Sequence, residues 1–327
     1  MNTGMKITAF AAAVAATFGT AYGVGQGVDP VTAQKKPASE HGGHTGEKEE
    51  PGGTRAGAGH ADTVPGGLQI SERGYTLDLR TSRIDAEKRE ELRFAVVEQT
   101  KGGKGGKGKN VTAYEREHGK ELHLIVASQD LRTYRHLHPT RAADGTWSTP
   151  VELPEAGGYR VFADFRPEGA KEGLTLGADL AVAGKYEPRK LPEADTKASV
   201  AGGYEVSLKG ELKPGKSSDV TLDVEKNGRP VTDLQPYLGS YGHLVALRSG
   251  DLAYLHVHPT GSPGDGRTKP GPGVSFAATA PSAGAYRLFL DFKHEGKVRT
   301  AEFTVWAGAS QQGGEDEGAP EPGGHQH

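Results

Sequence analysis

Three histidines recur at the same spacing in two parts of the sequence. The second set follows the first at an offset of 120 positions: His123, His136 and His138, then His243, His256 and His258. In each set the last two histidines belong to a His-x-His-Pro sequence. Imidazole nitrogen is a ligand for Zn(II), Cu(II) and Ni(II). Each set therefore has the composition of a site for one divalent transition metal ion.

Strand geometry predicts that each set converges. A two-residue turn at 249–250 would place His243 directly opposite His256, and the aligned turn in the first copy would place His123 opposite His136. Directly opposed residues have Cβ atoms about 4.5–5.5 Å apart, and a residue two positions further along shares their face of the sheet. We therefore expect two three-histidine sites, one in each half of the chain. Histidines that only hydrogen-bond to one another are the alternative.

The donor atoms limit the choice of metal. The chain has no cysteine, and its two methionines, Met1 and Met5, stand at the N-terminus, so a site elsewhere must use nitrogen and oxygen. This favours Cu(II) or Zn(II) and argues against a blue-copper centre or tight Cu(I) binding. Asp164 and Asp291 lie on a late predicted strand of each half. Each is a candidate for a fourth ligand, or for an acceptor that holds an imidazole in one tautomer; an aspartate that only anchors a loop is the alternative.

Two related halves make up the sequence between the tails. Gly74-Tyr75 matches Gly203-Tyr204, and residues 158–165 match residues 285–292 in a late strand. Insertions fall where loops are expected, as in a tandem duplication. Short alternating runs bounded by glycine, proline and aspartate are typical of antiparallel sandwiches. We therefore expect an all-β protein with two tandem immunoglobulin-like β-sandwich domains and disordered N- and C-terminal tails.

Composition places the boundaries between these segments. We expect, in order, a signal peptide or membrane anchor (1–28), a disordered linker (29–67), the first sandwich (68–185), a second linker (186–199), the second sandwich (200–308) and a disordered tail (309–327). The first linker and the tail carry further histidines, which would bind metal only weakly or not at all. The net charge of −3 gives no electrostatic reason to expect nucleic acid as a partner.

The N-terminus indicates export. Lys6 precedes an Ala-rich run from Ile7 to Gly25 that is almost free of charge, with a cleavage position after Gly23. About 19 weakly apolar residues are also near the shortest bilayer span, so an uncleaved anchor is the alternative. Both alternatives place the body of the protein outside the cytoplasm, either secreted or held at the cell surface by this segment.

The histidine segments resemble a group of largely uncharacterised exported bacterial proteins. The resemblance rests on His123-Leu-Ile-Val-Ala-Ser-Gln-Asp-Leu with His136-Leu-His138-Pro139, and on Gly242-His243-Leu-Val with His256-Val-His258-Pro259. In general plan the halves are also similar to periplasmic copper-resistance carrier domains and to domains named after the YtkA and FixH proteins. The resemblance implies a β-sandwich and a role in copper or heavy-metal handling. It implies no particular reaction.

Taken with the residues, these features predict a function in binding. We expect an exported, non-enzymatic protein that sequesters or delivers Cu(II) or Zn(II), with a metal-handling protein of the membrane or cell envelope as a candidate partner. An immunoglobulin-like adhesion or scaffold module with structural histidines is the alternative. A metal-dependent hydrolase is a third hypothesis, because a three-histidine ion can activate water, but no glutamate stands at a recognisable spacing to act as general base.

Overall fold

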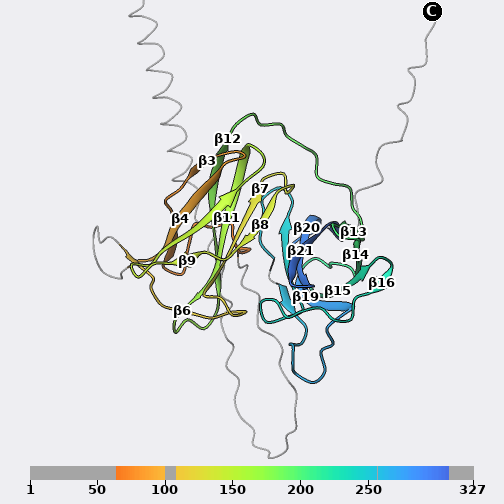
Figure 1. Cartoon of the computed structure of the whole chain (residues 1–327). Helices are drawn as coiled ribbons and strands as arrows, with labels where there is room; N and C mark the ends of the chain where they lie inside the picture. The colour runs from red at the N-terminus through yellow and green to blue at the C-terminus, as the bar shows by residue number, and fades with distance from the viewer. Residues whose placement is uncertain (1–63, 100–107, 256, 309–327) are drawn as a thin grey trace, which may run out of the picture. The chain divides into compact units, whose positions relative to one another are not determined.

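All regular structure in the described part of the chain is β-strand. The computed structural model describes residues 64–99, 108–255 and 257–308 (Figure 1). The predicted signal or anchor segment, most of the predicted 29–67 linker and the 309–327 tail lie outside these ranges. Over the described residues there is no helix of the length and hydropathy needed to span a membrane.

The first repeat contains two six-stranded sheets. One has the order β1-β2-β4-β10-β9, with β5 on β4, and the other has the order β3-β12-β11-β7-β8, with β6 on β11. The strands are β1 (Ser71–Glu72), β2 (Tyr75–Leu79), β3 (Arg83–Asp85), β4 (Arg89–Glu98), β5 (Lys109–Asn110), β6 (Tyr114–Glu115), β7 (Leu122–Ser128), β8 (Tyr134–Leu137), β9 (Thr140–Arg141), β10 (Thr146–Glu152), β11 (Gly157–Pro167) and β12 (Leu174–Ala183).

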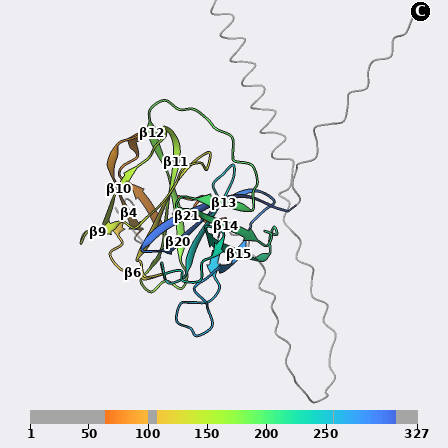
Figure 2. The same ribbon diagram turned by 45° about the vertical axis from the view of Figure 1, so that its right-hand side comes forward.

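The second repeat has the same plan with a smaller second sheet. Its sheets have the orders β13-β14-β15-β19-β18, with β16 on β15, and β17-β20-β21. The strands are β13 (Lys197–Val200), β14 (Tyr204–Lys209), β15 (Ser217–Lys226), β16 (Arg229–Pro230), β17 (Gly242–Arg248), β18 (Val257–Pro259), β19 (Gly273–Thr279), β20 (Gly284–His294) and β21 (Lys297–Ala307). Figure 2 shows this repeat from a second direction.

The strand order is that of an immunoglobulin sandwich. In the first repeat β2, β4, β10 and β9 take the places of strands A, B, E and D, and β7, β11 and β12 those of C, F and G. Tyr159, near the start of β11, donates a hydrogen bond to the carbonyl of Glu155, and Tyr286 does the same to Ser282, each over 2.8 Å. These are tyrosine corners, a mark of the fold. The prediction of two tandem immunoglobulin-like sandwiches is therefore confirmed.

Strand β7 is buried along its whole length because both of its faces are covered. Leu124 and Val126 enter the core of the first sandwich, whereas Ile125 and Ala127 face outward into a second apolar cluster. Successive side chains of a strand point to opposite faces, so one strand serves both cores. The second core holds side chains of both repeats, and we call it the inter-repeat cluster: Ile125, Ala127, Leu131, Tyr134, Phe162, Val245, Leu247, Leu252 and Phe289.

The inter-repeat cluster joins equivalent faces of the two repeats. Tyr134 stacks on Phe289 with ring centroids 4.1 Å apart, and Tyr254 lies 5.8 Å from Phe162. Tyr134 and Tyr254 occupy matching positions of the duplication, as do Phe162 and Phe289, so the two contacts are related by exchange of the repeats. Figure 1 shows β7 and β8 on the side of the first repeat that faces the second. Each fully buried aromatic or aliphatic side chain stabilises this contact by about 1.5–3 kcal/mol.

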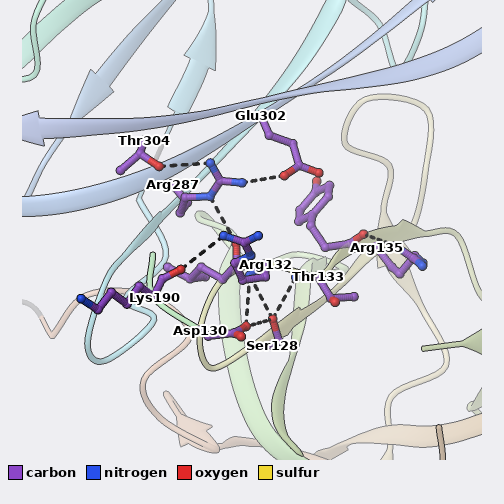
Figure 3. Close-up of polar contacts among 11 residues, drawn as sticks. Ser128, Asp130, Arg132, Thr133, Arg135, Lys190, Arg287, Glu302 and Thr304 are labelled. Atoms are coloured by element: carbon purple, nitrogen blue, oxygen red, sulfur yellow. Dashed lines mark hydrogen bonds and ion pairs between the residues drawn. The ribbon is translucent and has the colours of Figure 1, made fainter. Parts of the chain in front are cut away.

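A buried arginine adds polar contacts at the edge of the inter-repeat cluster (Figure 3). Arg287 of β20 is 4% exposed and donates to the Glu302 carboxylate over 2.5 Å and to the Thr304 hydroxyl over 3.1 Å. Its Nε donates to the carbonyl of Leu131, in the β7–β8 loop of the other repeat, over 3.2 Å. The guanidinium of Arg287 is thus paired with Glu302 of its own repeat, and its hydrogen bond to Leu131 links the two repeats.

A short segment before β1 also bridges the repeats. Residues 66–69 accept or donate backbone hydrogen bonds to Thr175 and Gly177 of β12, over 2.7 and 2.8 Å, and to Tyr254 of the second repeat, over 2.9 Å. Arg160 donates to two carbonyls of the same segment. Residues 66 and 67 were expected at the end of the disordered linker, and here they are hydrogen-bonded. Backbone atoms approach β12 so closely that position 177 has no room for a side chain.

This close approach predicts the effect of Gly177→Ala. The added Cβ would overlap the carbonyl oxygen of Gly67 and lie 2.7 Å from Arg160 Nε, so the bridging segment must move. We expect the free energy of unfolding in urea to fall by about 1–3 kcal/mol. Gly173→Ala is the matched control, because its Cβ would meet only the flexible tip of Glu117, 3.2 Å away. Equal stability of the two variants would contradict the bridging role.

Candidate metal centre

The β7–β8 hairpin aligns its histidines in a register that differs from the predicted one. Ile125, and not His123, is the Cα partner of His136. The expected two-residue turn is wrong because the loop is longer: Asp130 accepts a hydrogen bond from the backbone of Arg132 over 3.2 Å, and Leu131 adopts a left-handed φ of 55°. The shift is two residues, and a shift of two preserves the face to which each side chain points. All three histidines of this hairpin therefore still share one face.

That face is the one covered by the other repeat, so histidines from both halves meet. The centroid of the His243 ring lies 5.3 Å from that of His123 and 4.7 Å from that of His136. His138 lies 5.5 Å from His123 and 4.8 Å from His136 by the same measure. We call His123, His136, His138 and His243 the histidine cluster. Within it, one nitrogen from each of His123, His136 and His243 lies within 4.8 Å of the other two.

Hydrogen bonds to oxygen fix the tautomers of two of these rings. His136 Nδ1 lies 2.8 Å from the carboxylate of Asp291, and His123 Nε2 lies 3.2 Å from the carbonyl oxygen of Glu117. Both oxygens can only accept, so both of these nitrogens carry protons. The other Asp291 oxygen accepts from Thr300 over 2.6 Å, which holds the carboxylate in place.

The two remaining nitrogens then face each other with lone pairs. A neutral imidazole has one N–H, so His123 Nδ1 and His136 Nε2, 3.1 Å apart, are both acceptors. With this assignment, a positive charge between them satisfies both nitrogens: either a proton, which makes His136 an imidazolium paired with Asp291, or a metal ion. Two nitrogens bound to one tetrahedral Zn(II) lie about 3.3 Å apart, given Zn–N bonds of about 2.0–2.1 Å. The observed separation of 3.1 Å is close to that of a metal-bound pair and is also that of an ordinary hydrogen bond.

Two further nitrogens of the histidine cluster have no hydrogen-bond partner. Nε2 of His243 and Nε2 of His138 are both buried and unpaired among the described residues. A buried polar atom without a partner costs about 1–3 kcal/mol. A metal ion bound by His123, His136 and Nε2 of His243 would satisfy one of these atoms, and the ring of His138 lies beside this group without belonging to it. The residues present therefore fit a nitrogen-bound divalent ion.

Burial keeps most of these rings neutral. Desolvation, reinforced by His136, lowers the pKa of His123 to about 3. Desolvation likewise lowers the pKa of His138 to about 4 and holds the pKa of His243 well below its ordinary value. Only neutral imidazole can bind a metal. These three rings are therefore in the ligating form at neutral pH without first losing a proton.

The second set of histidines is distributed differently. His243 joins the histidine cluster, whereas His258 is exposed on β18, which pairs with β19 in the opposite sheet. His256 lies outside the described residues. The chain crosses between sheets earlier here than in the first repeat, where β8 continues to Leu137 and the crossing strand begins at Thr140. The described residues thus form one three-histidine group drawn from both repeats, in place of one from each.

The two candidate aspartates have unlike surroundings. Asp291 is 2% exposed and contacts His136 of the other repeat, so it holds an imidazole in one tautomer across the inter-repeat contact. Asp164, at the matching position, is half-buried and accepts a hydrogen bond from Thr175 over 2.8 Å. Neither carboxylate belongs to the three-histidine group found among the described residues.

Sequence reasoning missed one histidine near the site. His118 has its ring centroid 6.1 Å from that of His123 and 5.9 Å from that of His243. The matching residue of the second repeat is Leu238, so the duplication gave no sign of a role for His118. The signal that could have found the shared site was the lack of polar–apolar alternation in β7 and β17, whose outward faces are as apolar as their inward faces.

Comparison with known proteins identifies the repeats. The family model described as "Domain of unknown function (DUF8832)" matches the chain twice, over residues 70–180 and 198–309. No curated protein matches the chain.

Several solved structures show partial likeness to the chain at low sequence identity. Invasin, described as a bacterial integrin-binding protein, is 12% identical, with a TM-score of 0.21 over 72% of this chain and 39% of its own. The Yersinia pseudotuberculosis adhesin InvE is 11% identical, with a TM-score of 0.22 over 73% of this chain and 60% of its own. The D0-D1 domain of intimin is 10% identical, with a TM-score of 0.19 over 71% of this chain and 97% of its own. The chain thus spans less than two thirds of the first two. At these scores the immunoglobulin plan rests on the strand order and tyrosine corners.

Burial of neutral histidines predicts that the metal-free protein loses stability in mild acid. The pKa of His123 is about 3 when folded and about 6.5 when unfolded, so between these values the unfolded state binds more protons. The contribution of His123 to the free energy of unfolding is therefore complete above pH 6.5 and is lost as pH falls. We expect the free energy of unfolding, measured with chelator, to change little near pH 7 and to decrease below about pH 6.5 with a slope that approaches about 1.4 kcal/mol per pH unit for this ring alone. In His123→Gln the number of protons taken up on unfolding should be smaller by about one, so the free energy of unfolding should depend less steeply on pH. An unchanged pH dependence would contradict the burial of His123 as a neutral ring.

Proposed function

The chain belongs to the family described as "Domain of unknown function (DUF8832)", which it contains twice, and we propose that it is a non-enzymatic protein that binds one divalent transition metal ion between its repeats. His123, His136 and His243 are the ligands, with His138 as the candidate fourth. The observation that carries the proposal is the convergence of three imidazole nitrogens within 4.8 Å of one another, with Nδ1 of His123 and Nε2 of His136 3.1 Å apart and Nε2 of His243 buried and unpaired.

The donor set supports Zn(II) or Cu(II). The three-histidine group found among the described residues offers three imidazole nitrogens, and no sulfur is available in the chain outside the N-terminus. Imidazole suits both ions. Asp291 accepts a hydrogen bond from Nδ1–H of His136, which raises the basicity of the ligating Nε2. The protein would use such a site to sequester the ion or to deliver it to another protein of the cell envelope.

A location outside the cytoplasm is part of the proposal. It rests on the sequence of the first 28 residues, with Lys6 and the Ala-rich run that follows. The absence of cysteine fits a metal site that does not depend on a reduced thiol. Whether the segment is cleaved or retained as an anchor does not change which residues bind the ion.

Catalysis has less support. A metal-activated water needs a carboxylate free to take its proton. Asp291, the carboxylate hydrogen-bonded to the histidine cluster, already accepts from His136 with one oxygen and from Thr300 with the other. We therefore propose binding and not hydrolysis.

A structural role for the histidines is the second candidate. If a proton lies between His123 and His136, the imidazolium of His136 forms an ion pair with Asp291 over 2.8 Å and the cluster needs no metal. The protein would then be an adhesion or scaffold module. Under this alternative the purified protein carries no metal and its melting temperature does not respond to EDTA.

Calorimetry with Zn(II) separates these possibilities. We expect one tight equivalent for the full chain, lost in both His136→Ala and His243→Ala because the ligands come from both repeats, and kept in His258→Ala, whose side chain is exposed on another sheet. Weak binding by the terminal histidines should be equal in all variants. Tight binding that survives both of the first two substitutions would refute the site. Two equivalents, one lost in His258→Ala, would instead support one site in each repeat.

Asp291→Asn tests how the ligand is held. The amide can present a donor to His136 in place of the carboxylate, so the ligating tautomer is no longer favoured. We expect the affinity for Zn(II) to fall about 10–100-fold with the stoichiometry unchanged. Asp164→Asn is the matched control, because it makes the same change at the equivalent position of the first repeat. Equal effects of the two substitutions would show that Asp291 has no special part in binding.

A further inference from the structure

His118 lies at the surface directly over the buried histidine cluster. It stands in a tight turn closed by hydrogen bonds between Glu117 and Lys120, over 2.9 and 3.0 Å, and adopts a left-handed φ of 52°. Its side chain is exposed, whereas His123 is only 3% exposed. The ring nevertheless lies within van der Waals range of the cluster, with centroids 6.1 Å from His123 and 5.9 Å from His243.

Contacts from both repeats position this turn. The carbonyl of Glu117 accepts the hydrogen bond from His123 Nε2, so the turn that carries His118 also orients a ligand. From the second repeat, Gly239 approaches so closely that a Cβ there would lie 3.6 Å from His118 Cα and 3.8 Å from its Nδ1. Gly239 has a φ of 74°, in the region that favours glycine. The place of His118 is therefore fixed relative to both repeats.

A small cavity is lined by both His118 and His243. Its volume is about 10 Å³, and its lining includes His118, Leu238, Gly242 and His243. About 10–15 Å³ is enough for one water molecule. His243, which lines this cavity, also carries the buried and unpaired Nε2 atom.

The fold of the turn does not require a histidine. Leu238 occupies the matching position in the second repeat, with a φ of 51°, and its turn is closed by the same pair of hydrogen bonds between Tyr237 and Ser240. The imidazole of His118 is therefore not needed to shape the backbone, because the matching turn, which borders the same cavity, has a leucine in its place.

We propose that His118 is a capture ligand: it binds the incoming divalent ion at the surface and passes it by ligand exchange to His243 and then to His123 and His136. This inference rests on the proposed metal site. Each step replaces a water or an imidazole on the ion by another imidazole, with no change of oxidation state. A ligand used only in transit lowers the barrier in both directions, so it speeds association and dissociation equally and leaves the equilibrium affinity unchanged.

Stopped-flow kinetics with Cu(II), kept soluble by glycine, tests this step on the full chain through quenching of intrinsic fluorescence. The variant is His118→Asn, because asparagine adopts a left-handed φ readily and keeps the turn that holds Glu117. We expect association and dissociation rate constants to fall together by about tenfold or more, within the range that single substitutions produce, with the equilibrium affinity changed less than about threefold.

Glu87→Asn is the control, since Glu87 is exposed, has a left-handed φ of 59° and lies in the turn between β3 and β4. It should leave both rate constants as in the wild type. Unchanged rate constants in His118→Asn would overturn the capture role. A lower affinity with an unchanged association rate would overturn it as well, because His118 would then be a permanent ligand. Absence of saturable Cu(II) binding by the wild type would refute the metal site itself.

Discussion

The structure depends on the burial of one outward sheet face of each repeat against the other. Ile125 and Phe162 from the first repeat and Val245 and Phe289 from the second are fully buried in the inter-repeat cluster. Burial of this apolar surface is the driving force for the contact. The histidines lie on the same faces because side chains two positions apart in a strand share a face. Whatever holds the repeats together therefore also brings the histidine cluster together.

Placement in this contact gives the histidines their chemistry. On a solvated hairpin, the same rings would titrate near pH 6.5 and point into water. Between the repeats, desolvation keeps His123 neutral, and Asp291 from one repeat orients His136 from the other. Since the candidate ligands come from both repeats, an ion bound there would also join the two domains. Metal binding and domain contact are thus linked in a single site.

Much of the fold follows from local sequence. Alternation, turn residues and the duplication predict two immunoglobulin-like sandwiches, and face parity predicts that His123, His136 and His138 share one face. The predicted register of the β7–β8 hairpin was wrong because the loop that contains Asp130 and Leu131 is longer than two residues. The length of that loop depends on contacts beyond the turn. The partnership of His243 with the first repeat could not be read from spacing, since packing of two faces is a long-range property. The local sign in the sequence was a strand such as β7, with apolar residues on both of its faces.

Anomalous scattering from crystals grown with Zn(II) would test the central claim most directly. The account predicts a strong peak at the zinc edge between the repeats, within bonding distance of nitrogens of His123, His136 and His243. A well-ordered structure with saturating zinc, in which the space between His123 and His136 shows no peak and the two rings keep their direct contact, would contradict it.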